Sequence, residues 1–226
     1  MDITTEFNEL SPWITRFNIE GTAYGGDFDA MNDVRIDQFF AAFPDVKTVL
    51  ELGSLEGGHS FAIARHPSVE KVIAVEARSE NIERAKFIKG LLKDEKVEFV
   101  EADLEKADLS TFGKFDAVLC SGLYHLPEPW KLVEQCGKVS GGIFIWTQNA
   151  CENEAKKFSG GYRGKWYREG GWRDPLSGVS KYSFWLSFGS LVNLLTANGF
   201  ERIEVIENNL EHPKGCAVTL AATAHS

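Results

Sequence analysis

The stretch "VKTVLELGSLEGGHSFAIARH", residues 46–66, passes from an apolar run through a glycine-rich turn into a segment with helical spacing of its apolar residues. The apolar run predicts a buried strand at residues 48–52. A glycine-rich turn between a strand and a helix presents backbone N–H groups at the positive end of the helix, where nucleotide-type ligands bind in α/β proteins. The stretch therefore predicts an α/β fold with a ligand site at this turn, although glycines after a strand also serve as plain turn residues.

The spacing of the glycines separates the classes of nucleotide site. Three residues stand between Gly53 and Gly57, whereas dinucleotide-binding turns follow the pattern G-x-G-x-x-G. No Lys-Ser or Lys-Thr pair follows the glycines, as a phosphate-binding P-loop requires. Glu51 and Glu56 would repel a polyphosphate and suit a ligand with an ammonium group. The turn therefore favours a ligand without a pyrophosphate.

Composition and charge limit the class of protein. The chain has 226 residues, of which 43% are hydrophobic and 25% charged, values typical of a folded globular protein. Its net charge of -9 would repel a phosphate backbone unless basic residues cluster. No apolar run is long enough to span a bilayer, and the first residues do not resemble a signal peptide. We therefore expect a soluble, cytoplasmic protein without a membrane partner.

The cysteines form no recognisable metal or redox motif. Cys120, Cys136, Cys151 and Cys216 lack C-x-x-C spacing, which argues against a zinc site or a redox pair. A chain of this length does not need a disulfide in order to fold. We therefore expect most of them to be thiols in the core or on the surface, and we predict no metal site.

Short apolar strands alternate with amphipathic segments after residue 44, which is typical of βαβ units on a parallel sheet. Further strands are predicted at 71–76, 97–101, 115–120, 142–147, 202–207 and 216–222, with helices near 79–94 and 187–200. We expect one domain over residues 1–226. Its predicted parts are an N-terminal flap or strap (1–40), a cofactor-binding core (41–149), a substrate lid (150–185) and a C-terminal helix with a strand pair (186–226).

Polar side chains follow the next predicted strands. Glu76 ends the second strand, where a carboxylate accepts hydrogen bonds from ribose hydroxyls in folds of this class. Asp103 follows the third strand and suits an adenine amino group, with the Leu104 backbone beside the ring, or else the cap of a helix. Ser121 follows the fourth strand, where the reactive part of the ligand would lie. Each feature is ordinary alone, but their order is specific.

This ordered set resembles the class I S-adenosylmethionine-dependent methyltransferases over residues 45–225. The matching pieces are "VLELGSLEGG", "VIAVEAR", "VEADL", "FDAVLCSGLYHL", "GGIFIWT" and "LLTANGFERIEVIE". The resemblance implies a three-layer, Rossmann-like α/β fold with a mostly parallel seven-stranded sheet whose last strand is antiparallel. It implies S-adenosyl-L-methionine as the cofactor, held by Glu51, Gly53, Ser54, Gly57, Glu76, Ala77, Asp103, Leu104 and Ser121.

His125, shortly after the fourth strand, is the candidate catalytic residue. Methyl transfer is an in-line displacement that mainly requires donor and acceptor to be held close and aligned. A base helps where a hydroxyl or ammonium acceptor must lose a proton. His125 is the candidate for that base or for a substrate-positioning group, and Tyr124 for a pocket wall. The alternative is that this histidine only caps or packs.

The segment 150–185 is the most informative about the substrate. Its seven Lys and Arg residues outnumber four Asp and Glu residues, and eight aromatic residues lie among them. Cations beside aromatic rings suit an anionic or flat acceptor, so Arg163, Trp166 and Trp172 are candidate substrate contacts. The alternative is a surface loop that buries its own aromatic residues.

The predicted function is methyl transfer to O or N of a small, anionic or aromatic molecule. One alternative is a transfer-RNA-modifying enzyme of the same fold, since "GLYHLPEPW" resembles enzymes that alkylate wobble uridine; RNA is disfavoured because one basic patch is a small footprint. Another is a non-catalytic protein that binds an adenosyl ligand. The N-terminal segment is predicted either to close over the cofactor, with Arg16 near its carboxylate, or to pack as a fixed strap. The oligomeric state is left open.

Overall fold

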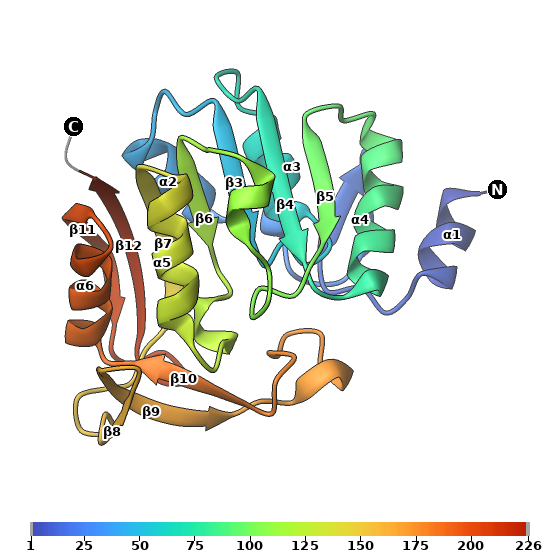
Figure 1. The fold of residues 1–226 in the computed structure, drawn as a ribbon. Helices are drawn as coiled ribbons and strands as arrows, with labels where there is room; N and C mark the ends of the chain where they lie inside the picture. Colours follow the sequence, from blue (N-terminus) through green and yellow to red (C-terminus); the bar gives the residue numbers. More distant parts are fainter. Residues whose placement is uncertain (1, 225–226) are drawn as a thin grey trace. The chain divides into compact units, whose positions relative to one another are not determined.

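The computed structural model describes residues 2–224, and the chain divides into two compact units that meet between Ala102 and Asp103. Their strands form a seven-stranded, mostly parallel sheet, and the last strand, β12, is antiparallel to its neighbours. Helices accompany the strands in each unit (Figure 1). The fold class expected from the sequence is therefore confirmed.

The first unit combines an N-terminal hairpin with a parallel sheet. Its elements are α1 (Ile3–Glu9), β1 (Arg16–Ile19), β2 (Thr22–Gly25), η1 (Ala30–Asn32), α2 (Val34–Ala42), β3 (Thr48–Leu52), α3 (Gly58–Ala64), β4 (Lys71–Glu76), α4 (Ser79–Leu92) and β5 (Val97–Glu101). Strand β4 lies between β3 and β5 and is parallel to both. The predicted limits of these three strands match the observed ones. The apolar side chains of β3 and β4 account for this because they form the core of the unit.

The second unit contains the other four strands of the large sheet. Its elements are η2 (Leu109–Phe112), β6 (Ala117–Cys120), η3 (Leu123–His125), α5 (Pro129–Val139), β7 (Gly142–Gln148), β8 (Lys157–Ser159), β9 (Tyr162–Arg168), η4 (Gly171–Arg173), β10 (Tyr182–Leu186), α6 (Phe188–Ala197), β11 (Phe200–Asn209) and β12 (Ala217–Ala224). The strand order within the unit is β11-β12-β7-β6. Strand β6 begins two residues later than predicted, because Phe115 makes only an isolated bridge to Ser140.

The segment predicted as a lid folds as a small sheet of its own. Strands β8, β9 and β10 are antiparallel, and β9 is central. Phe184 and Trp185 of β10 are fully buried, whereas Trp166 and Tyr167 of β9 are 46% and 39% exposed. Phe184 and Trp185 therefore form the core of this sheet, whereas Trp166 and Tyr167 stay on its surface.

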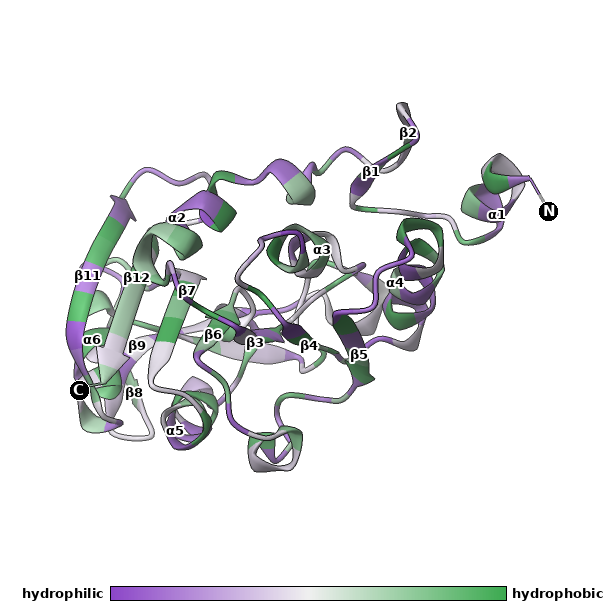
Figure 2. Cartoon of the chain, turned by 90° about the horizontal axis from the view of Figure 1, so that it is seen from above, coloured by the Kyte–Doolittle hydropathy of each residue, from purple (hydrophilic) through white to green (hydrophobic). Residues whose placement is uncertain are grey.

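Strand β11 is an edge strand of the large sheet. Along it hydrophilic and hydrophobic residues alternate, as the bands of colour on this strand show (Figure 2). Charged side chains on an edge strand oppose pairing with a further strand. Within residues 2–224, no helix is both long and apolar enough to cross a membrane. A cytoplasmic location stays a prediction.

A disulfide between Cys151 and Cys216 corrects the expectation that most of the four cysteines are thiols and that the chain has no disulfide. Strands β7 and β12 pair with Gln148 opposite Ala217, which brings the two cysteines together across 65 residues of sequence. Sequence spacing could not show this, because it depends on the pairing of the two strands. Cys120 and Cys136 are buried thiols, as expected.

Breaking the disulfide should destabilise the protein by about 4 kcal/mol, the chain-entropy value for a loop of this length. Denaturant unfolding with and without a reductant measures the change, and Cys216→Ser is the control that should lose its response to reductant. Thiol titration of the unfolded, unreduced protein should find the two thiols of Cys120 and Cys136. Four reactive thiols would contradict the pairing.

Candidate functional site

The glycine-rich turn closes tightly at the end of β3. The N–H groups of Gly53 and Ser54 both donate to the carbonyl of Val75, at 2.9 and 3.0 Å. Gly57 has a φ of +83°, and a Cβ atom there would lie 2.6 Å from the Phe99 ring. A side chain at this position is therefore excluded both by backbone conformation and by contact. The turn keeps its backbone close to the ends of β3 and β4.

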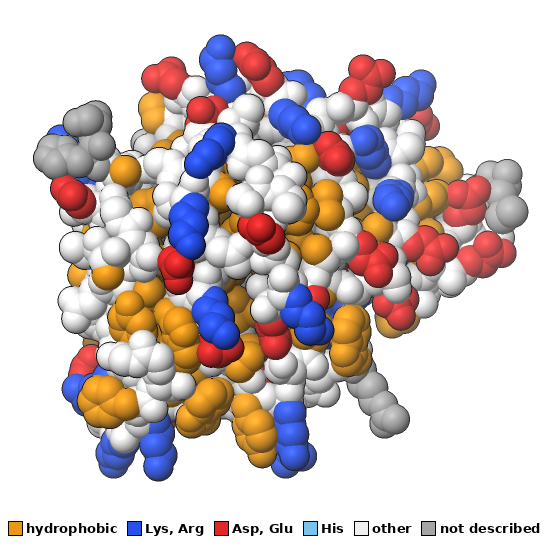
Figure 3. Space-filling model, viewed as in Figure 1, with side chains coloured by type: hydrophobic (Ala, Val, Ile, Leu, Met, Phe, Trp, Pro, Cys, Tyr) orange, Lys and Arg blue, Asp and Glu red, His pale blue; other side chains and the backbone are white. Residues whose placement is uncertain are grey.

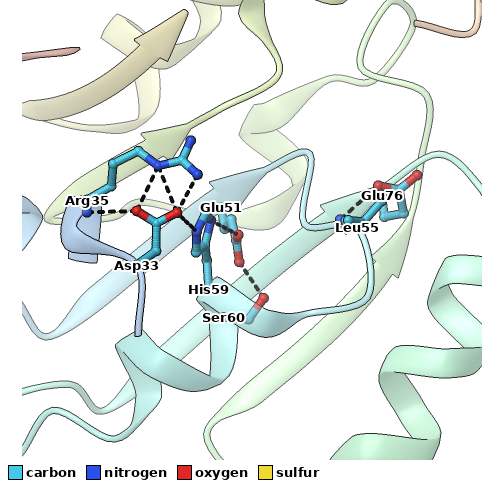
Figure 4. Close-up of polar contacts among 7 residues, drawn as sticks. All are labelled: Asp33, Arg35, Glu51, Leu55, His59, Ser60 and Glu76. Atoms are coloured by element: carbon cyan, nitrogen blue, oxygen red, sulfur yellow. Dashed lines mark hydrogen bonds and ion pairs between the residues drawn. The ribbon is translucent and has the colours of Figure 1, made fainter. Parts of the chain in front are cut away.

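Glu76 joins the end of β4 to this turn. Its carboxylate accepts hydrogen bonds from the N–H of Leu55 at 3.0 Å and of Arg78 at 2.9 Å (Figure 4). Burial raises the pKa of Glu76, and the two backbone N–H groups oppose that shift. The side chain predicted to hold the ribose is thus fixed in place beside the turn, with a carboxylate oriented by backbone donors.

Glu51 lies at the end of β3 and is 1% exposed. The Ser60 hydroxyl donates to its Oε2 atom, and His59 Nδ1 lies 3.9 Å from Oε1. On the other side of the imidazole, His59 Nε2 lies 3.1 Å from Asp33 Oδ2. Arg35 binds the same aspartate (Figure 4). His59 therefore belongs to a buried chain of polar side chains that links the start of α2 to the end of β3.

The N-terminal segment is fastened to the glycine-rich turn through Glu56. This buried carboxylate accepts hydrogen bonds from the N–H groups of Ile14 and Thr15, the latter at 2.6 Å. Gly26 is packed against the carbonyl oxygens of Trp13 and Ile14. In the structure the segment is thus a packed strap. Arg16, predicted to lie near a ligand carboxylate, pairs with Asp29 at the surface.

The remaining predicted cofactor residues lie where the sequence places them, after their strands. Ala77 follows β4, Asp103 and Leu104 follow β5, and Ser121 follows β6. No helix begins at Asp103 among the described residues; its carboxylate accepts from the Glu105 N–H and binds Lys106 at 2.7 Å. Asp103 therefore caps a single turn, whose Lys106 and Ala107 N–H groups donate to its carbonyl, and not a helix.

The first unit fits an adenosyl ligand with an amino-acid end. The Ser54 hydroxyl is buried in the turn and has no hydrogen-bond partner among the residues that the structure describes. Buried polar atoms normally have partners, so this atom is an unused donor and acceptor at the expected ligand position. Glu76 offers a carboxylate for hydroxyl groups, and the turn lacks the G-x-G-x-x-G glycines of a pyrophosphate site.

His125 is held by a carboxylate that the sequence did not single out. In the second unit, His125 Nδ1 lies 3.3 Å from Glu169 Oε2. The same carboxylate accepts hydrogen bonds from the Ser177 hydroxyl, the Gly178 N–H and the Ser183 hydroxyl, at 2.6, 2.9 and 2.5 Å. His125 Nε2 has no partner within the described part of the chain, and 22% of the side chain is exposed.

Glu169 stays ionised because of these donors. Burial alone would raise the pKa of Glu169, but the hydrogen bonds from His125, Ser177, Ser183 and Gly178 outweigh it and lower the pKa to about 2. Gly178 is needed here for a second reason, since a Cβ atom would lie 2.4 Å from the His125 carbonyl oxygen. The carboxylate is therefore a fixed negative charge behind the imidazole.

Aromatic rings surround the other side of His125. The Tyr124 ring lies 3.9 Å from the imidazole centroid and also contacts Trp146 and Trp185. A small pocket with room for about one water-sized group opens beside Tyr124; it is lined by Leu123, Tyr124, Pro129, Thr147, Gln148, Asn149, Phe184, Leu186 and Leu191. Asn149 Oδ1 is buried without a partner within residues 2–224. Tyr124 lines this pocket, and its role as a wall of the substrate site stays a prediction.

The other predicted substrate contacts lie elsewhere on the small sheet. Arg163 binds the carbonyl oxygens of Glu152 and Ala155 and the Glu152 carboxylate. Trp166 pairs with Phe184 in the sheet register, so it faces away from Ser183 and Tyr167. Arg163 thus joins β9 to the loop at residues 152–155, and the register places Tyr167, and not Trp166, on the side of Ser183.

Exposed hydrophobic residues gather on the segment 158–182. Trp172 of η4 is 59% exposed, and the others are Phe158, Trp166, Tyr167, Leu176 and Tyr182. Figure 3 shows hydrophobic and basic side chains beside one another along the lower edge of the molecule, where β9 and β10 lie in Figure 1. The described residues include no group of three or more His, Cys, Asp and Glu side chains that could hold a metal ion.

Sequence reasoning missed Glu169 and Asp33. The contact of Glu169 with His125 spans 44 positions and that of Asp33 with His59 spans 26, so no local motif records either. One signal was present: Glu169 is the only acidic residue between Lys156 and Arg173. Asp33 precedes an apolar run in the manner of a helix N-cap and caps α2.

Comparison with known proteins agrees with this geometry. A family model described as "Methyltransferase domain" matches residues 45–161. No curated protein is significantly similar to the chain. Among solved structures, the N-terminal domain of EvdMO1, crystallised in the presence of SAH and D-fucose, is 35% identical with a TM-score of 0.89. That match covers 100% of this chain and 98% of the EvdMO1 domain.

Two further structures mark the limits of the similarity. The full EvdMO1 structure is 32% identical with a TM-score of 0.79, and the match covers 98% of this chain but 47% of EvdMO1. The YcgJ protein from Bacillus subtilis is 15% identical with a TM-score of 0.61, over 85% of this chain and 99% of YcgJ, which shows a shared fold. The chain thus corresponds to about half of the full EvdMO1 protein.

Proposed function

This chain belongs to the S-adenosylmethionine-dependent methyltransferases, and on that basis we propose that it methylates a hydroxyl oxygen of a neutral, sugar-like molecule with His125 as the base. The family and the cofactor are the premise. The acceptor and the catalytic residue are the proposal, and the His125–Glu169 pair is the observation that supports it most.

The pair suits removal of a proton from a hydroxyl. Glu169 accepts a hydrogen bond from Nδ1, which fixes the imidazole tautomer and leaves Nε2 as the basic nitrogen. No residue in the described part of the chain forms a hydrogen bond with Nε2. A hydroxyl acceptor must lose its proton during attack, and an imidazole within hydrogen-bond reach provides general-base catalysis. The buried carboxylate then stabilises the imidazolium that forms.

The lid favours a neutral acceptor over an anionic one. Arg163 and Lys165 pair with Glu152 and Glu154, at 3.2 and 2.6 Å, so their charges are already balanced inside the lid. Tyr124 and Tyr167 instead offer aromatic faces, on which the C–H face of a sugar ring packs. The presence of D-fucose with the similar EvdMO1 domain is consistent with such an acceptor.

S-adenosylmethionine, when bound, supplies the methyl group. Glu76 would hold its ribose, Ser54 and Glu51 would lie at its amino-acid end, and Asp103 with Leu104 would contact the adenine. His125 would take the acceptor proton at Nε2, and Tyr124 would align the acceptor. The protein would thus contribute mainly by aligning the cofactor with the acceptor, and it would take part in one proton transfer.

The experiment is an acceptor screen that measures formation of S-adenosylhomocysteine. Neutral deoxysugars and hexoses, sugar phosphates, phenols, amines and transfer RNA form the arms. We expect turnover with neutral sugars, and products heavier by one methyl group in mass spectra. Turnover confined to amines, to anionic metabolites or to transfer RNA would reject the proposed acceptor. The transfer-RNA arm tests the alternative that the protein is a transfer-RNA-modifying enzyme.

A further inference from the structure

A buried chain of polar side chains runs from the start of α2, through the first turn of α3, to the end of β3. Arg35 Nε lies 3.0 Å from both carboxylate oxygens of Asp33, and Asp33 Oδ2 lies 3.1 Å from His59 Nε2. His59 Nδ1 faces Glu51 Oε1 at 3.9 Å, and Ser60 donates to the second oxygen of Glu51 (Figure 4). Of these residues, the function proposed above uses only Glu51.

Burial increases along this series of side chains, from Arg35 to Glu51. Side-chain exposure is 18% at Arg35, 10% at Asp33 and His59, and 2% at Glu51. Charges this deep need partners, because the interior stabilises an isolated ion poorly. Arg35 balances Asp33. One acid and one base, Glu51 and His59, then face each other at the inner end.

The contacts determine which nitrogen of His59 is available. Because the Asp33 carboxylate accepts from Nε2–H, Nδ1 is the unprotonated nitrogen and points toward Glu51. Burial would raise the pKa of Asp33, but hydrogen bonds from His59 and Arg35 outweigh it and lower that pKa. Asp33 is therefore a permanent anion behind the imidazole.

Burial favours the protonated form of Glu51 when no cation lies beside it. Burial raises the pKa of Glu51 to about 8, the Ser60 hydrogen bond opposes this shift, and the charge of Glu76 adds to it. Burial lowers the pKa of His59, against the effect of Asp33. Near neutral pH the inner end of the chain thus holds a neutral acid facing a neutral base.

We propose that Asp33 and His59 are positioning residues for the amino-acid end of the cofactor. When an ammonium group binds beside the Glu51 carboxyl, His59 takes up the Glu51 proton with the support of Asp33. The O–H bond of Glu51 breaks, an N–H bond forms at His59 Nδ1, and Asp33 holds the imidazolium. No proton leaves the protein. The two atoms must approach by about 1 Å for this transfer. The proposal rests on the cofactor placement given above, with Glu51 at the amino-acid end.

Asp33→Asn is the variant that tests this role. Asparagine keeps the N-cap of α2 but removes the negative charge behind His59. Two ligands are compared by calorimetry: S-adenosylhomocysteine, and 5′-methylthioadenosine, which lacks the amino-acid end. We expect the affinity for S-adenosylhomocysteine to fall about tenfold and the affinity for 5′-methylthioadenosine to stay unchanged. The matched control Asp29→Asn, which breaks a surface pair with Arg16, should change neither.

Equal losses for both ligands would show that Asp33 only supports the fold, and no loss for either would also overturn the proposal. A second measurement needs no variant. Nitrogen NMR of the His59 ring should show protonation of both nitrogens with S-adenosylhomocysteine but not with 5′-methylthioadenosine. A ring that stays neutral with both ligands would reject the proton transfer. Neither experiment uses a methyl acceptor, so a failure of the proposed sugar acceptor would be seen separately.

Discussion

Replacing His125 with alanine should lower kcat by about 100- to 10,000-fold, the usual contribution of a general base, while the affinity for S-adenosylhomocysteine stays the same. In the proposed mechanism the loss falls on kcat, because the imidazole would act on the acceptor proton during methyl transfer, whereas the turn and Glu76 would bind the cofactor. Steady-state kinetics with the preferred sugar, together with calorimetric titration of S-adenosylhomocysteine, measures both effects.

Two further variants make this prediction specific. His66→Ala removes a histidine that stacks on Phe40 and bonds Ser68, and it should leave kcat unchanged. Glu169→Gln should lower kcat strongly in the parent protein but have little further effect once His125 is alanine, because Glu169 acts through the imidazole. A decrease in kcat of less than threefold in His125→Ala, or additive effects of the two changes, would contradict the assignment.

Glu76→Ala should weaken binding of S-adenosylhomocysteine by about 1–3 kcal/mol, roughly a 5- to 150-fold loss of affinity. The carboxylate is buried and oriented by the N–H groups of Leu55 and Arg78, so in the proposed placement it would meet the ribose hydroxyls without a cost of ordering. Its removal also frees the Leu55 N–H and so loosens the turn. Both effects reduce affinity in the same direction, and calorimetric titration measures their sum.

Controls separate ribose recognition from general damage. Glu70→Ala removes an exposed carboxylate that pairs with Lys47 and should leave the affinity unchanged. Glu76→Gln keeps an acceptor oxygen but not the charge, so its affinity should lie between those of the parent protein and the alanine variant. NAD and NADP should not bind to any of these proteins. An unchanged affinity in a folded Glu76→Ala protein would refute the placement of the ribose.

The elements proposed to carry the cofactor site were predictable from the sequence because local patterns fix them. Apolar runs bounded by glycine or charged residues predicted β3, β4 and β5 with their observed limits, since buried parallel strands consist of such runs. The glycine spacing after β3 predicted a turn without a pyrophosphate, and the strand ends predicted the places of Glu76 and Asp103. In each case the sequence pattern lies within the short segment whose structure it predicts.

The features that the sequence did not predict depend on contacts between distant segments. The disulfide follows from the register of β7 with β12, and the support of His125 by Glu169 follows from the fold of the loop after β9. The face that Trp166 occupies depends on its pairing with Phe184. Alternating cations and rings in β9 were interpreted as a ligand surface, although Arg163 and Lys165 balance nearby carboxylates.

The most direct test of the account is the identity of the methylated atom. The protein is supplied with S-adenosylmethionine carrying a carbon-13 methyl group and with the best neutral sugar from the screen, and the product is examined by carbon NMR. The account predicts a methyl ether on a sugar oxygen with the parent protein, formed together with an equal amount of S-adenosylhomocysteine, and almost none with His125→Ala. A methyl signal on nitrogen, or equal yields from both proteins, would contradict it.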